Sequence, residues 1–247
     1  MFSVDKSLTK LGQSKIFSKL DAKSGFWQIP LCPESRLLTT FITSFGHFCF
    51  NQLPFSISSA SEIFQRTVSQ ILEGLDGVIC HMDNILIHAP NQAMHDQHSA
   101  VFQCLTEAGV TLNEKCKFSQ TSIKFLGHTI DAKSINTDPD KVEAIKKFPA
   151  PTNITELQRF MGMVNQLAMF IPSLADSNAP LRHLLHKDTT WVWDQPQQSA
   201  FQQIKELLIS PPVLAHYDPK RPTIIAADAS STGIGAVLLQ AQDNGSL

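Results

Sequence analysis

The stretch Val78-Ile79-Cys80-His81-Met82-Asp83-Asn84-Ile85-Leu86-Ile87 consists of two short apolar runs on either side of a polar tetrad. This pattern predicts a β-hairpin over residues 78–88 whose tip carries Asp83. A second carboxylate, Asp21, closes the strand-like run 15–20, and residues 25–29 are strand-like again. Because hard divalent cations prefer oxygen ligands, carboxylates at neighbouring strand ends predict a metal site formed by Asp21 and Asp83.

The first half of the chain predicts an α+β unit in which helices pack on an antiparallel sheet. Ser58 or Ser59 caps a helix that ends near residue 74, and Gly109 ends a helix that starts at residue 91. Turn-forming residues separate the strand-like runs. We expect a short helix over residues 3–11 and strands over 15–20, 26–31, 38–42, 47–51 and 118–130.

The second half of the chain is predicted to be mainly helical. Asp138 before Pro139 is a typical helix start, and Asn153 with Glu156 resembles a capping box that opens an amphipathic helix. Asp194 caps a further helix, and two strands are expected over 223–228 and 233–239. The apolar residues expected to face the core of this helical part are Leu157, Phe160, Met161, Val164, Leu167, Ala168, Phe201, Ile204, Leu207 and Leu208.

Composition excludes few classes of protein. The 20 Lys and Arg residues against 22 Asp and Glu give a net charge of −2, so any contact with nucleic acid must come from local patches. The five cysteines form no Cys-x-x-Cys pair and predict free, partly buried thiols. His88, His95 and His98 match no usual zinc-ligand spacing and are expected at the surface. Without an apolar span or signal peptide, we expect a cytosolic or nuclear protein and no membrane partner.

Six blocks of the sequence, in order, resemble the Pol polyprotein of gypsy-type LTR retrotransposons. The first three resemble the catalytic and nucleotide-pocket blocks of a reverse transcriptase, the next two resemble blocks that follow the palm, and the last resembles the opening of a ribonuclease H domain. These blocks are residues 17–29, 53–66, His81-Met82-Asp83-Asn84, Phe125-Leu126-Gly127-His128, 160–172 and Ala227-Asp228-Ala229-Ser230. The resemblance extends over nearly the whole chain.

This resemblance implies the fold class and the reaction. It implies an α+β reverse transcriptase palm with a remnant of the fingers over residues 1–133, a helical thumb and connection over 134–190, and a truncated start of a ribonuclease H-like domain over 191–247. The implied reaction is RNA-directed DNA synthesis, with nucleotidyl transfer to a primer 3′ hydroxyl by two Mg²⁺ or Mn²⁺ ions. The implied partners are an RNA or DNA template-primer and deoxynucleoside triphosphates, while the oligomeric state stays open.

The resemblance also implies roles for individual residues. Asp21 and Asp83 match metal-binding catalytic residues, and Asn84 stands where the family has a further Asp. Phe26 matches the residue that excludes a 2′-hydroxyl from the incoming nucleotide. The other implied roles are nucleotide binding for Phe55, Ser56 and Gln65, contact with the primer end for Phe125, Leu126, Gly127 and His128, and a remnant of the ribonuclease H metal site for Asp228.

Several departures from the family pattern predict impaired catalysis. Asn84 brings no charge to offset two dications, and Ser56 places a side chain where the family has Gly. Ser61 and Ser134 replace a usual Pro and Gly, the segment 112–116 is one residue short, and the family's fingers are expected before residue 1. Whether the chain is an active enzyme therefore stays open. The alternatives are a catalytically inactive relic that binds nucleic acid or a protein partner, and a fragment with no stable fold.

Overall fold

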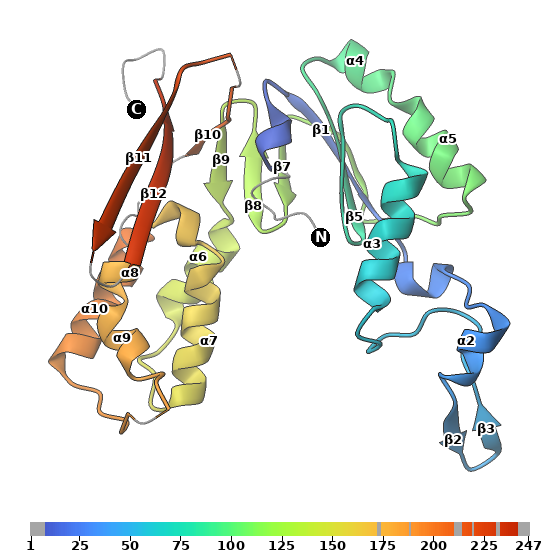
Figure 1. The fold of residues 1–247 in the computed structure, drawn as a ribbon. Coiled ribbons are helices and arrows are strands. Elements are labelled where there is room, and N and C mark those ends of the chain that lie inside the picture. The colour runs from blue at the N-terminus through green and yellow to red at the C-terminus, as the bar shows by residue number, and fades with distance from the viewer. Residues whose placement is uncertain are drawn as a thin grey trace. The chain divides into compact units, whose positions relative to one another are not determined.

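The computed structural model describes residues 8–171, 174–187, 189–209, 214–218, 220–230 and 233–241. The chain divides into two compact units, one formed by Met1–Thr121 with His216–Leu247 and the other by Ser122–Ala215 (Figure 1). Most of the helix expected over 3–11 lies outside the described residues. The described part is a short 3-10 helix, η1 (Thr9–Leu11), beside which Leu8 and Leu11 are buried.

A four-stranded antiparallel sheet organises the first unit. Its strand order is β4 (Val78–His81), β5 (Asn84–Ala89), β1 (Ile16–Asp21), β6 (Lys117–Gln120), so the predicted hairpin pairs directly with the strand that ends in Asp21. Helix α3 (Ala60–Ile71) buries an apolar face against this sheet, as its periodicity predicts. The buried core residues here are Leu20, Ala22, Phe64, Val68, Leu72, Ile85, Ile87, Val101 and Leu105.

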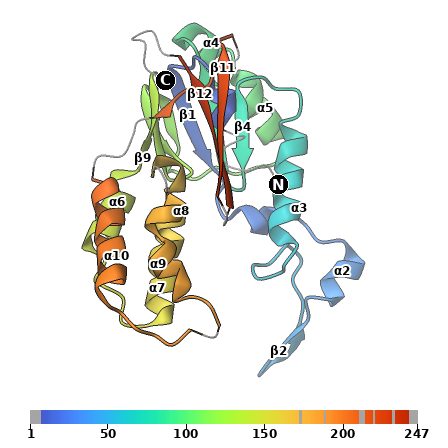
Figure 2. The ribbon, with the colours of Figure 1, turned by 60° about the vertical axis from the view of Figure 1, so that its left-hand side comes forward.

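The prediction of a strand over residues 26–31 is wrong. Residues Gly25–Gln28 form a 3-10 helix, η2, because Phe26 packs among aromatic rings while the Gln28 amide bonds the backbone of Thr111. A short helix α2 (Pro33–Leu37) precedes a hairpin of β2 (Phe41–Thr43) and β3 (Gly46–Phe48), which shortens the two strands expected there. This hairpin extends away from the sheet of the first unit in both views (Figures 1 and 2).

The single helix expected over 91–108 is divided into α4 (Gln92–Asp96) and α5 (Ser99–Glu107). The division follows a tertiary contact, because His95 on α4 turns inward to the hydroxyl of Ser18 on β1, with Nε2 and Oγ 3.0 Å apart. His95 is therefore buried, and the expected surface position is wrong for this histidine. Gly109 ends α5 with a φ of +71°, as predicted.

The second unit combines a sheet with a helical core. The residues expected as one strand over 118–130 form β6 of the first unit, then β7 (Ser122–Phe125) and β8 (His128–Asp131); these two continue with β9 (Ser134–Thr137) and β10 (Leu214–Ala215) in the order β10-β9-β8-β7. The helices gather at one end of this sheet (Figures 1 and 2). They are α6 (Pro139–Lys147), α7 (Ile154–Asn165), η3 (Ala168–Phe170), α8 (Leu174–Ser177), α9 (Ala179–His183) and α10 (Gln195–Leu207).

The predicted helix starts of this unit are confirmed. The Asp138 carboxylate accepts from the Asp140 amide at 3.1 Å, and Asn153 Oδ1 accepts from the Glu156 amide at 2.9 Å. The Asp194 amide in turn donates to Gln197 Oε1 at 3.2 Å. Eight of the ten apolar residues expected to face the core are buried and belong to one cluster, while Ala168 and Leu207 are only half-buried.

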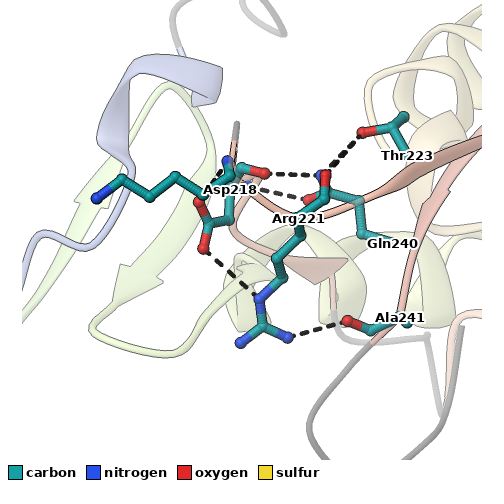
Figure 3. A network of polar contacts seen from close by, with 6 residues as sticks. Asp218, Arg221, Thr223, Gln240 and Ala241 are labelled. Atoms are coloured by element: carbon teal, nitrogen blue, oxygen red, sulfur yellow. Dashed lines mark hydrogen bonds and ion pairs between the residues drawn. The ribbon is translucent and has the colours of Figure 1, made fainter.

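The last described strands, β11 (Thr223–Ser230) and β12 (Gly233–Gln240), pair antiparallel along their full length. Figure 3 shows how Gln240 ties the end of β12 to the preceding segment: Nε2 donates to the carbonyl of Asp218 at 2.8 Å and lies 3.0 Å from Thr223 Oγ1. Arg221 joins the same network through the carbonyl of Ala241 at 2.9 Å. The hairpin is therefore held at its open end.

The cysteines bear on one further prediction. All five cysteines are free, as predicted, although Cys32 and Cys49 are exposed rather than partly buried. Among the described helices, none is long and apolar enough to cross a membrane.

Candidate active site

The carboxylates of the predicted metal site lie at the end of one strand and in the turn beside it. Asp21 is the last residue of β1 and stands opposite Asn84, the first residue of β5, while Asp83 lies in the turn between β4 and β5. The Ala22 amide donates to the carbonyl of Asp83 at 2.9 Å, so the chain beyond β1 continues along the hairpin tip. Backbone pairing thus brings the two acidic residues to the same edge.

A cavity of about 330 Å³ opens at this edge of the sheet. Four of the residues predicted for the site, Asp21, Phe26, Phe55 and Asp83, line it. Sequence reasoning missed others, because their places depend on turns and long-range pairing. The full lining consists of Asp21, Ala22, Ser24, Gly25, Phe26, Phe55, Phe64, Met82, Asp83 and Asn113.

Aromatic contacts hold Phe26 in the wall of the cavity. Its ring centroid lies 5.4 Å from that of Phe55 and 5.4 Å from that of Phe64, both in edge-on geometry. Such pairs contribute roughly 0.5–1.5 kcal/mol beyond their buried area. Gly25 permits this packing, since a Cβ at that position would stand 2.6 Å from Phe64 Cζ. The orientation of Phe26 is therefore set from two sides.

The backbone of Asp21 is fixed by the segment 112–116. The Asn113 amide donates to the Asp21 carbonyl at 2.8 Å, and the Asp21 amide donates to Cys116 Sγ at 3.4 Å. Asn113 was not predicted as a site residue, although it lines the cavity. Leu112 forms a bridge with Ala22, and this long-range pairing has no signal in the local sequence pattern.

Asn84 contacts its neighbour in the hairpin instead of the cavity wall. Its Nδ2 donates to Asp83 Oδ1 at 2.8 Å, and Asn84 is not among the cavity-lining residues.

Ser56 is exposed, lies outside the cavity lining and adopts a φ of +72°, the left-handed region in which the family's Gly is unstrained. By contrast, Ser134 lies outside that region, and its amide bonds Asp131 Oδ1 at 2.9 Å. The replacement of the usual Gly thus strains position 56 and leaves position 134 unstrained.

Gln65 also lies outside the cavity lining. Its Oε1 accepts from the Met82 amide at 2.5 Å, and its Nε2 donates to the Cys80 carbonyl at 3.2 Å. Burial raises the pKa of the Cys80 thiol to about 12, with the charge of Asp83 acting in the same direction. This thiol on β4 of the hairpin is therefore protonated at neutral pH and is a poor metal ligand.

The donor chemistry of Asp21 and Asp83 fits Mg²⁺ or Mn²⁺, because both ions favour carboxylate oxygens and retain water and substrate oxygens. Within the described ranges, however, no group of three or more His, Cys, Asp or Glu side chains could hold a metal ion. That finding agrees with the amide at position 84. The cavity lining contains two carboxylates, those of Asp21 and Asp83.

The residues predicted to contact the primer end lie in the second unit, at the turn between β7 and β8. Phe125 and His128 are buried, and the ring centroid of His128 lies 5.6 Å from that of Phe170. Leu126 and Gly127 form the turn with φ values of +52° and +81°. Any contact from this block would therefore use the turn at Leu126 and Gly127.

Asp228 lies within β11, where its backbone is paired with that of Gly235. The Pro172 end of the block 160–172 falls outside the described residues.

Comparison with known proteins agrees with this fold. The family described as "Reverse transcriptase (RNA-dependent DNA polymerase)" matches residues 1–130, more than half of the chain. The chain therefore belongs to the reverse transcriptase family. The family described as "RNase H-like domain found in reverse transcriptase" matches residues 193–247.

Full-length relatives and solved structures point in the same direction. The chain is 36% identical over 245 residues to the Transposon Tf2-7 and Tf2-8 polyproteins of Schizosaccharomyces pombe, covering 98% of this chain and 18% of each polyprotein. It is thus similar to a retrotransposon polyprotein and spans about a fifth of its length. A foamy viral protease-reverse transcriptase in complex with an RNA/DNA hybrid is structurally similar, with a TM-score of 0.87, 22% identity, and coverage of 99% of this chain and 34% of that chain. That likeness supports the α+β reverse transcriptase fold.

Proposed function

We propose that the chain is the RNA-directed DNA polymerase part of a gypsy-type LTR retrotransposon polyprotein. The observation that carries the proposal is the cavity in which Asp21 and Asp83 meet Phe26 and Phe55. Membership of the reverse transcriptase family and 36% identity to the Tf2 polyproteins support it.

The proposed chemistry assigns a task to each of these groups. Asp21 and Asp83 would hold Mg²⁺, which when bound activates the primer 3′ hydroxyl and neutralises the leaving pyrophosphate. Phe26, braced by its neighbouring rings, would lie under the sugar of the incoming nucleotide and exclude a 2′-hydroxyl. Phe55, more than half exposed and in ring contact with Phe26, would contribute to the edge of the nucleotide pocket.

The proposed partners are an RNA or DNA template-primer and deoxynucleoside triphosphates. Complexes of the foamy viral enzyme with an RNA/DNA hybrid and with double-stranded DNA support the first partner. We further propose a palm with fingers residues over 1–133, a thumb and connection over 134–190, and ribonuclease H-like residues over 191–247. The family matches at residues 1–130 and 193–247 support these functional divisions.

Primer extension tests the proposed polymerase. The full chain is incubated with a labelled DNA primer on an RNA template, deoxynucleotides and Mg²⁺. Asp21→Asn and Asp83→Asn each remove a charged ligand and are expected to lower the extension rate by at least about 10²-fold. Asp76→Asn, an exposed carboxylate outside the cavity, is the matched control and retains the wild-type rate. Extension by wild type and both cavity variants at equal rates would refute the assignment.

A second candidate function is nucleic-acid binding without catalysis. The neutral side chain of Asn84 beside Asp83 favours it, because only two charged ligands face the cavity. A single experiment distinguishes the two functions. Tight binding of the labelled template-primer, with no extension in either Mg²⁺ or Mn²⁺, identifies the chain as a binding module.

A further inference from the structure

The side-chain amide of Gln65 forms hydrogen bonds with the β4–β5 hairpin and with its own helix. From α3, Oε1 accepts from the Met82 amide at 2.5 Å. Nε2 donates to the Cys80 carbonyl at 3.2 Å and to Ser69 Oγ at 3.0 Å. Both ends of the side-chain amide therefore have partners, and two of these partners are backbone groups of the hairpin.

These backbone groups belong to the edge of the sheet. The strand order places β4 at one end, with β5 as its only neighbour in the sheet. In an antiparallel ladder, alternate residues turn their backbone groups away from the partner strand, where a further strand would pair with them. Gln65 occupies that position for Cys80 in β4 and also bonds Met82, the first residue of the turn that follows β4. Next to the turn, the Gln65 side chain thus makes the hydrogen bonds that a further strand would otherwise make.

The turn that Gln65 contacts is also strained. Met82 adopts a φ of +55°, a left-handed conformation that costs a non-Gly residue roughly 1–2 kcal/mol. Both Met82 and the following Asp83 line the cavity. The bond to the Met82 amide therefore holds a strained residue in the conformation that presents Asp83 to the cavity.

We propose that Gln65 is a positioning residue that clamps the hairpin and sets the place of Asp83, and is not a nucleotide ligand. The proposal rests on the polymerase function proposed above. A nucleotide ligand would need a free amide in the cavity wall, whereas Gln65 lies outside that wall with both amide atoms engaged.

Two substitutions separate the bonds from the bulk of the side chain. Gln65→Met keeps an unbranched chain of similar length and loses both hairpin bonds. Gln65→Glu keeps the acceptor for the Met82 amide and loses the donor to Cys80. Gln103→Met is the matched control, because Gln103 on α5 bonds Glu107 one turn away and does not line the cavity.

The first readout is backbone amide hydrogen exchange measured by NMR. In Gln65→Met, the Met82 amide is expected to exchange at least tenfold faster than in wild type, while that of Leu86 in the buried strand β5 is unchanged. Gln65→Glu and Gln103→Met keep Met82 protected. A Met82 amide that stays protected in Gln65→Met overturns the inference. If the Leu86 amide also loses protection in Gln65→Met, that variant has lost structure beyond the turn, and the test then rests on Gln65→Glu. Loss of Met82 protection in Gln65→Glu overturns the inference that Gln65 holds the hairpin.

The second readout is primer extension as a function of nucleotide concentration. A positioning role predicts that Gln65→Met lowers kcat by about tenfold and leaves the KM for the nucleotide within twofold, with partial rescue in Gln65→Glu. A raised KM with unchanged kcat identifies Gln65 as a nucleotide ligand and overturns the inference. If wild type extends no primer, the polymerase proposal fails, and the exchange of the Met82 amide decides the role of Gln65 by itself.

Discussion

Asn84 Nδ2 donates a 2.8 Å hydrogen bond to Oδ1 of Asp83, the residue that precedes it in the hairpin. This bond engages one oxygen of the carboxylate that we propose as a metal ligand. A neutral amide orients that carboxylate but adds no charge to the site. Compared with the Asp that is usual in the family, Asn84 therefore removes one charged group from the proposed metal site. It also changes the hydrogen bonding of the Asp83 carboxylate.

We predict that Asn84→Asp strengthens Mg²⁺ binding by at least about tenfold, because a third carboxylate offsets more of the cation charge. In the metal-free chain the same substitution places two like charges side by side and is expected to lower the melting temperature. Isothermal titration calorimetry with Mg²⁺ and Mn²⁺, together with thermal melts, measures both effects. Asn136→Asp, in the second unit, adds the same charge at a residue that does not line the cavity and serves as control. A Mg²⁺ affinity that stays within twofold would show that Asn84 is only a turn residue.

Ser56 provides a test of backbone strain. Its φ of +72° is easy for Gly and unfavourable for other residues, and its side chain is exposed. Ser56→Gly is therefore expected to raise the free energy of unfolding by about 0.5–1 kcal/mol. Urea denaturation measures the change. The neighbouring Ser58, exposed and without a positive φ, is the matched control: Ser58→Gly is expected to lower stability. Equal effects at both positions would contradict the strain at Ser56.

The central hairpin and the amphipathic helix α7 could be predicted because their patterns are local. Two apolar runs around His81-Met82-Asp83-Asn84 specify a turn, and the period of Leu157, Phe160 and Val164 specifies a buried helix face. The capping box predicted for α7 forms only in part. Asn153 accepts from the Glu156 amide, but the Glu156 carboxylate accepts from the amide of Thr152.

The errors arise where distant residues decide the local structure. Phe26 is strand-like by composition, yet its contacts with Phe55 and Phe64 favour a 3-10 turn. In the same way, the contact of His95 with Ser18 accompanies the division of a helix that looks continuous in sequence. The candidate site shows this limit as well. Motifs identified the carboxylates, but only the folded chain shows that Asn113 joins them and that Gln65 is engaged by the hairpin.

Phe26 leads to a prediction about substrate choice. Because two rings brace Phe26, its removal opens space at the position proposed for the nucleotide sugar without a charge change. Phe26→Ala is expected to raise ribonucleotide incorporation relative to deoxyribonucleotide by at least about tenfold, as for other steric discriminations. Primer extension with single nucleotides of each kind measures the ratio. Phe41→Ala, in the β2–β3 hairpin outside the cavity, keeps the wild-type ratio. An unchanged ratio in Phe26→Ala would contradict the proposal that Phe26 excludes the 2′-hydroxyl.

The final prediction concerns His88, whose Nδ1 lies 2.8 Å from Ser14 Oγ. Burial lowers the pKa of His88 to about 4, and His98, Lys10 and His216 act in the same direction. Between pH 6.5 and 4 the unfolded chain then binds a proton that the folded chain excludes, so stability falls as pH falls through this window. From pH 7.5 to 5.0 the expected loss from this group is about 2 kcal/mol. His88→Asn removes the titration and is expected to flatten the pH dependence measured by urea denaturation. His47→Asn, exposed on β3, keeps the wild-type slope. If His88→Asn and wild type lose equal stability over this range, His88 is not the source of the acid sensitivity.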